Sequence, residues 1–144
     1  MLKLSKPSAR IFIILAFLAY IFVVLYVTLI SRSVYIFSIE LDPIASYRRA
    51  ANTQPHLAAI EIRNIILNVA MFMPLGIFLP LLCAKLRKFY IALPIAFLAS
   101  LAIEIAQLAT RRGVFSIEDI LHNTLGAALG LGLLLAASKI FKKS

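Results

Sequence analysis

The chain alternates between long apolar stretches and short groups of polar or charged residues, a pattern typical of multi-pass membrane proteins. A helix of about 20 apolar residues crosses the hydrocarbon core of a bilayer. Four stretches meet this length, at residues 11–30, 62–84, 89–110 and 117–138. Prolines inside such helices are tolerated, because neighbouring helices and water satisfy the freed backbone groups. We predict an all-α fold, a bundle of four transmembrane helices forming a single membrane domain over residues 1–144.

The composition supports this prediction, because 62% of the 144 residues are hydrophobic and 15% are charged. Soluble domains are typically about 45–50% apolar and roughly 25% charged, so the surplus apolar surface must face lipid. The net charge of +9 would suggest nucleic-acid binding in a soluble protein. Here the basic residues lie at the ends of the apolar stretches, where they anchor and orient helices, and we predict no nucleic-acid partner. The single Cys83 cannot form an internal disulfide.

The first apolar stretch could also be a signal peptide, because basic residues precede it. However, it exceeds the roughly 7–15 apolar residues of a signal peptide, and no A-x-A cleavage site follows it. We interpret it as an uncleaved anchor. If the N-terminus is cytoplasmic, all seven lysines lie on the cytoplasmic side, which favours an N-in, C-in orientation. Residues 31–61 then form a long extracytoplasmic loop.

This loop contains two recognisable signals. Asp42-Pro43 predicts a turn, and Thr53-Gln54-Pro55 predicts the start of a helix that continues into the second stretch. The segment from Val34 to Leu41 fits either an extended or an interfacial conformation, and its pattern does not decide between them.

Polar residues occur at the same, outer end of the second, third and fourth stretches, whereas the first stretch brings no comparable group. At about 1.5 Å per residue, Asn68, Glu104 and Asn123 lie roughly 9 Å inside the outer boundary. Spacings of three and four place the polar residues of each helix on one face. Because polar groups without partners are costly in hydrocarbon, we expect them to face one another or a water-filled cavity. The set is Asn64, Asn68, Glu104, Gln107, Arg111, Asp119, His122 and Asn123.

Structural roles are the alternative for several of these residues. Glu118, next to the set, fits a first-turn acid that complements the helix dipole. Asn64, Asn68 and Gln107 fit hydrogen bonds between helices, and Glu104 could form a structural ion pair with Arg111. Arg112 is better explained as an interface anchor. The glycines expected at close helix contacts are Gly126, Gly130 and Gly132.

Three ordered motifs contain most of the polar set. Residues 68–76 fit N-x-x-x-F-x-P-x-G, residues 100–107 fit S-x-x-x-E-x-x-Q with arginine following, and residues 119–126 fit D-x-x-x-N-x-x-G. With these motifs the chain resembles the VanZ-like family of small bacterial membrane proteins. The resemblance covers the last three stretches but not the first stretch and its loop. The segment 113–116 departs from the family, which often has further charged residues there.

The resemblance implies a multi-pass protein of the bacterial cytoplasmic (inner) membrane with a role in the cell envelope. The founding member is associated with resistance to teicoplanin, a lipoglycopeptide that acts on cell-wall precursors outside the membrane. Relatives occur with cell-envelope and exopolysaccharide functions.

The first functional hypothesis is an outer-leaflet site that binds or modifies a membrane lipid or a lipid-linked cell-envelope precursor. Arg111 would meet an anionic part of the headgroup, because guanidinium suits phosphate. The acid–base candidates are Glu104, Asp119 and His122. The residues that would orient the headgroup by hydrogen bonds are Asn64, Asn68, Gln107 and Asn123. These residue types allow hydrolysis or group transfer, but no motif for a covalent nucleophile is present, so enzymatic activity stays open.

The second hypothesis is a non-catalytic structural or assembly subunit of an envelope complex, with the polar residues as a buried network. A homo-oligomer or an envelope-complex partner would fit it. A transporter would also require an oligomer, because four helices per chain are few. One histidine with carboxylates is weak evidence for a metal site, so we predict neither a metal nor a cofactor.

Overall fold

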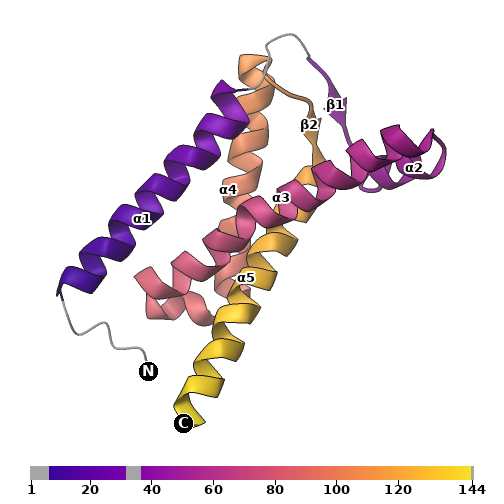
Figure 1. Ribbon diagram of the computed structural model, residues 1–144. Coiled ribbons are helices and arrows are strands. Elements are labelled where there is room, and N and C mark those ends of the chain that lie inside the picture. The colour runs from indigo at the N-terminus through magenta and orange to yellow at the C-terminus, as the bar shows by residue number, and fades with distance from the viewer. Residues whose placement is uncertain (1–6, 32–36, 144) are drawn as a thin grey trace.

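The computed structural model describes residues 7–31 and 37–143. Its helices are α1 (Pro7–Leu25), the π-helical turn η1 (Tyr26–Ile30), α2 (Ala45–Ala51), α3 (Pro55–Leu82), the 3-10 turn η2 (Ala84–Arg87), α4 (Phe89–Thr110) and α5 (Ile117–Lys143). Two short strands are β1 (Ile39–Glu40) and β2 (Phe115–Ser116). Figure 1 shows the four long helices, with the start of α1 and the end of α5 at the end of the bundle opposite the strands.

Four helices are long and apolar enough to cross a membrane: α1 with η1, α3, α4 and α5. The prediction of four long apolar helices is therefore confirmed, while the N-in, C-in orientation stays a prediction. The predicted helix start after Gln54 is also confirmed, because Pro55 occupies the first turn of α3, where a missing N–H is harmless. The 28 residues of α3 span about 42 Å, more than the roughly 30 Å hydrocarbon core. Figure 1 shows α3 crossing α5 obliquely.

The closest packing in the bundle joins α3 to α5 through three glycines. A Cβ atom at Gly76, Gly126 or Gly130 would overlap a backbone carbonyl of the facing helix. Small residues allow such close approach, and the backbones can then attract each other directly. The prediction of close packing is confirmed for Gly126 and Gly130. It is wrong for Gly132, because a Cβ there meets no atom of the described residues within 4 Å.

The buried core lies between α3, α4 and α5, and α1 packs against its edge. The core residues are Phe72, Leu75, Leu79, Ala92, Ala96, Ala127 and Leu131. Phe17 and Tyr20 of α1 pack against Phe78 of α3, and the Tyr20 hydroxyl donates a hydrogen bond to the Met71 carbonyl oxygen at 2.9 Å. The rest of α1 is largely exposed, as expected of a helix that faces lipid.

The two strands join loops that lie far apart in the sequence. β1 pairs in parallel with β2, with Ile39 opposite Phe115 and Glu40 opposite Ser116. In the segment Val34 to Leu41, whose conformation the sequence left open, residues 39–40 are therefore extended. Residues 34–36 of that segment lie outside the described part of the chain. The predicted turn at Asp42 is confirmed, because its Oδ1 accepts a hydrogen bond from the Ile44 N–H at 3.1 Å. The pairing of β1 with β2 places α2 beside the polar end of the bundle.

Candidate functional site

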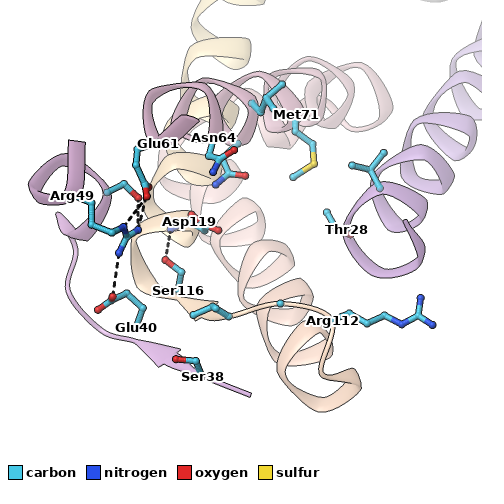
Figure 2. Close-up of a pocket in the computed structure, with 16 residues that line it drawn as sticks. Thr28, Ser38, Glu40, Arg49, Glu61, Asn64, Met71, Arg112, Ser116 and Asp119 are labelled. Atoms are coloured by element: carbon cyan, nitrogen blue, oxygen red, sulfur yellow. Dashed lines mark hydrogen bonds and ion pairs between the residues drawn. The ribbon is translucent and has the colours of Figure 1, made fainter. Parts of the chain in front are cut away.

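A pocket of about 690 Å³ opens at the end of the bundle that carries the strands. Residues from η1, β1, α2, α3, the α4–α5 connection and the first turn of α5 line it. Figure 2 shows acidic side chains and Arg49 on one side of the pocket, and Thr28 of η1 on the other. Val27 and Leu67 contribute exposed apolar side chains where η1 and α3 border the pocket. The pocket thus has a polar wall and an apolar border.

Arg49 of α2 is the central basic group of the polar wall. Its Nε and Nη2 donate to the two carboxylate oxygens of Glu61, at 3.0 and 3.3 Å. Nη2 also donates to Ser46 Oγ at 3.0 Å, and Nη1 donates to Glu40 Oε2 at 3.4 Å. Hydrogen bonds to Glu61 raise the pKa of Arg49 above its ordinary value, so the guanidinium stays charged throughout the physiological range. Arg49 therefore joins α2, α3 and β1 in one ionic cluster.

Two buried side chains of α5 hold α2 in place. Glu118 Oε2 accepts a hydrogen bond from the Ser46 backbone N–H at 2.8 Å. The His122 Nε2 and the Tyr47 hydroxyl lie 2.8 Å apart, and their rings meet edge to face. Glu118 is 1% exposed, so it does more than complement the helix dipole. It fixes the backbone that positions Arg49.

Glu104 of α4 fixes the start of α5 in the same way. Its Oε2 accepts a hydrogen bond from the Ser116 N–H at 2.9 Å, and the Asp119 N–H donates to Ser116 Oγ at 3.2 Å. Ser116 thereby caps the first turn of α5. In a capping box, the Ser116 backbone N–H would donate to the Asp119 side chain. Here that N–H donates to Glu104 instead. Further along the same interface, Asn123 Nδ2 donates to Ser100 Oγ at 2.8 Å.

The end of the first membrane helix also contributes to the site, contrary to the expectation that it brings no comparable group. Thr28 lines the pocket, and its carbonyl oxygen accepts a hydrogen bond from Gln107 Nε2 at 3.2 Å. Arg112 Nη1 donates to the carbonyls of Leu29 and Ile30 at 2.7 and 3.0 Å. These carbonyls lack intrahelical partners because the helix ends there. Arg112 therefore ties two helices together and is more than an interface anchor.

Arg111 ends α4 in a left-handed conformation, with φ of 55°. Its N–H donates to the Leu108 carbonyl and the next N–H donates to the Gln107 carbonyl, a helix ending at which glycine is usual. The Arg111 side chain is exposed and lies outside the pocket lining.

Three of the eight predicted site residues line the pocket: Asn64, Asn68 and Asp119. The other five, which are Glu104, Gln107, Arg111, His122 and Asn123, lie outside its lining. Asp119, His122 and Asn123 share one helix face as predicted, but they meet the pocket, α2 and α4 respectively. The polar residues therefore gather at one end of the bundle without all facing one cavity.

The sequence interpretation missed Arg49, Glu40 and Glu61. Glu61 could have been predicted from its spacing. It precedes Asn64 by three residues and Asn68 by seven, which places all three on one face of the helix that starts at Pro55. Arg49 of α2 and Glu40 of β1 lie in the connection between η1 and α3, where the sequence shows no hydrophobic periodicity. Within residues 7–31 and 37–143, no group of three or more His, Cys, Asp and Glu side chains is arranged to hold a metal ion.

Comparison with known proteins extends the resemblance beyond the three motifs. The sequence profile of the VanZ/LLP1 family matches residues 17–141, which include the C-terminal part of α1, all of η1 and the whole connection to α3. Searches of curated proteins and of solved structures found no significant match. Because the family match covers most of the length and includes at least part of each of the four apolar helices, this chain is a membrane protein that belongs to the VanZ/LLP1 family.

Proposed function

We propose that this protein binds a membrane lipid, or a lipid-linked cell-envelope precursor, by its headgroup in the pocket at the extracytoplasmic end of the bundle. The observation that carries the proposal is the border between the polar pocket and the lipid-facing surface. There Val27 of η1 is 46% exposed and Leu67 of α3 is 55% exposed, and both line the pocket. A headgroup could enter sideways between these helices while its acyl chains stay among exposed apolar side chains.

The dimensions of the pocket fit this kind of ligand. Small-molecule sites usually measure about 300–1,000 Å³, and this pocket measures about 690 Å³. The contacts of Tyr20 with Met71 and of Phe17 with Phe78 join α1 to α3 further along α1, towards its N-terminus. This packing closes the gap between the helices on that side and leaves the pocket open next to η1.

Binding accounts for the polar wall better than catalysis does. Of the three acid–base candidates, Asp119 lines the pocket, whereas Glu104 accepts a backbone N–H and His122 pairs with Tyr47. In the bacterial inner membrane, a protein that binds an outer-leaflet lipid could present or withhold an envelope precursor. This activity would connect the protein to the teicoplanin resistance that its resemblance implies.

A structural role is the second candidate, and it is favoured by a different group of residues. Glu104, Glu118 and Asn123 are each at most 2% exposed and hydrogen-bonded across element boundaries. Such bonds fix one arrangement of helices, because breaking them leaves buried polar groups without partners. We propose that these residues hold the wall of the pocket, so the two roles belong to different parts of the polar end.

The test compares two asparagines with the same substitution. Asn68 lines the pocket, whereas Asn123 lies in the α4–α5 interface and bonds to Ser100. Lipids that co-purify with the wild-type protein and with Asn68→Ala and Asn123→Ala would be identified by native mass spectrometry. We expect Asn68→Ala to reduce lipid retention with little change in thermal stability, and Asn123→Ala to lower stability. If Asn68→Ala retains lipid as the wild type does, the binding proposal fails.

A further inference from the structure

A second cavity, of about 750 Å³, adjoins the pocket. Glu40, Arg49 and Glu61 line both of them, and Figure 2 shows these three side chains together on the polar wall of the pocket. We call the second cavity the outer cavity. The ionic cluster around Arg49 therefore lies between two open spaces and does not form a closed end of the pocket.

The two cavities are built from different parts of the chain. The lining of the outer cavity comes entirely from residues 40–61, within the stretch that the sequence predicts to be an extracytoplasmic loop. The pocket is also lined by residues of η1 and of the start of α5, and it borders the exposed apolar side chains of Val27 and Leu67. A ligand that enters from lipid would therefore meet the pocket first and the outer cavity second.

The charged side chains of the outer cavity are paired with one another. Arg48 Nη1 lies 2.8 Å from Asp42 Oδ2. Arg49 pairs with Glu61 at 3.0 Å and with Glu40 at 3.4 Å. Because each carboxylate faces an arginine, this wall does not call for a charged ligand.

The paired groups can still bind a neutral polar ligand. An arginine has more N–H groups, and a carboxylate more lone pairs, than one ion pair uses. The side chains of Arg48 and Arg49 are 63% and 49% exposed, so a ligand can reach them. The amide of Asn52 and the hydroxyl of Thr53 belong to the same lining. Sugar hydroxyls suit such a mixture of donors and acceptors, because each hydroxyl both donates and accepts.

We propose that the pocket and the outer cavity form one bipartite site for a lipid with a saccharide headgroup, and this inference rests on the proposed lipid-binding function. The sugar next to the acyl chains would occupy the pocket, and a second sugar would extend past the Arg49 cluster into the outer cavity. A phospholipid headgroup consists of a phosphate and one small group, so it would leave the outer cavity unfilled. Each cavity alone has the size of a small-molecule site.

The test compares lipids that differ only in the length of the headgroup. Nanodiscs would contain equal amounts of phosphatidylglycerol, monoglucosyl diacylglycerol and diglucosyl diacylglycerol with identical acyl chains. Native mass spectrometry would count the lipids that stay bound to the released protein. We expect the diglucosyl lipid to be retained about tenfold over the monoglucosyl lipid, as one or two additional hydrogen bonds provide.

Each other outcome has a distinct meaning. Equal retention of the two glycolipids, or preference for phosphatidylglycerol, overturns the bipartite site and leaves lipid binding standing. If no lipid is retained, the proposed function fails together with the inference. A free glucose disaccharide that binds as tightly as the diglucosyl lipid would overturn a lipid as the source of the sugar.

Matched arginine variants test whether the outer cavity holds the second sugar. Arg48 lines only the outer cavity, and its exposed ion pair with Asp42 contributes little to stability. Arg63 of α3 is exposed and lies outside both linings. We expect Arg48→Gln to abolish the preference for the diglucosyl lipid and Arg63→Gln to preserve it. Equal losses would show that positive charge in general, and not this cavity, selects the headgroup.

A second variant fills the outer cavity. Leu57 lines only this cavity and is 44% exposed, so a larger side chain there extends into open space. We expect Leu57→Trp to reduce retention of the diglucosyl lipid to that of the monoglucosyl lipid. If neither Leu57→Trp nor Arg48→Gln changes the preference, the second sugar does not bind in the outer cavity and the inference is wrong.

Discussion

The contact between α3 and α5 provides a sharp test of the fold. A methyl group at Gly130 would overlap a backbone carbonyl of α3, whereas one at Gly132 meets nothing within 4 Å in the described chain. The variants Gly130→Ala and Gly132→Ala add the same methyl group to the same helix, two residues apart. They therefore differ mainly in what the methyl group meets.

The expected difference follows from two opposing effects. Alanine is favoured over glycine inside a helix by up to about 1 kcal/mol, and this gain applies at both positions. Overpacking a close contact costs about 1–3 kcal/mol, and this cost applies at Gly130. Because the obstructing atom belongs to the backbone of α3, a side-chain rotation cannot relieve the overlap and the helices must separate. Because the gain is common to both variants, we expect Gly130→Ala to be about 1–3 kcal/mol less stable than Gly132→Ala, which should itself be as stable as the wild type or slightly more stable.

Equilibrium unfolding in mixed detergent micelles, followed by circular dichroism, measures this difference. Gly76→Ala provides a check from the facing helix, because its added methyl group would also overlap a backbone carbonyl, here of α5. It should behave like Gly130→Ala. If Gly130→Ala and Gly132→Ala unfold at the same denaturant concentration, the two backbones are not in contact and the assigned packing is wrong.

Two further predictions concern polar residues with structural roles. Ser100→Ala removes the acceptor of the buried Asn123 amide, so we expect a loss of about 1–3 kcal/mol in the same unfolding assay; an unchanged midpoint would contradict the buried hydrogen bond. Arg111 has a positive φ, which costs a non-glycine residue roughly 1–2 kcal/mol, so Arg111→Gly should be as stable as the wild type or more stable. Arg111→Gly should also keep any lipid that co-purifies with the wild type. Loss of that lipid would show that Arg111 contributes to binding, as the sequence predicted.

The sequence was most informative about the helices, because the bilayer allows few alternatives. A long apolar segment must satisfy its backbone groups internally, so it forms a helix. Length and hydropathy then locate each span, as for α4, whose predicted and observed bounds of 89–110 agree. The start of α3 was also predictable, because Pro55 after a polar turn marks a first helical turn. The seven-residue helix α2 was not predicted, since short helices depend on tertiary contacts.

The site was harder to predict, because the spacing of residues shows which face of a helix they share but not which neighbouring element each side chain contacts. Residues three and four apart share a stripe of roughly 100°, which at the start of α5 is wide enough to meet three different neighbours. Asp119 therefore reaches the pocket, while His122 reaches α2 and Asn123 reaches α4. Arg49 was beyond sequence reasoning, because the strand pairing that brings its loop to the bundle involves two residues on each side.

The buried acids explain why the two functional hypotheses need not compete. A carboxylate that is almost fully buried must be compensated by strong hydrogen bonds, and Glu104 and Glu118 each accept one from the backbone of an adjoining segment. Those bonds fix Ser116 and Ser46, which line the pocket. Asp119 is only partly buried and lines the pocket itself. The acids that hold the wall and the acid that lines the pocket are thus different residues, so a loss of function caused by a Glu104 variant would not identify Glu104 as a binding residue.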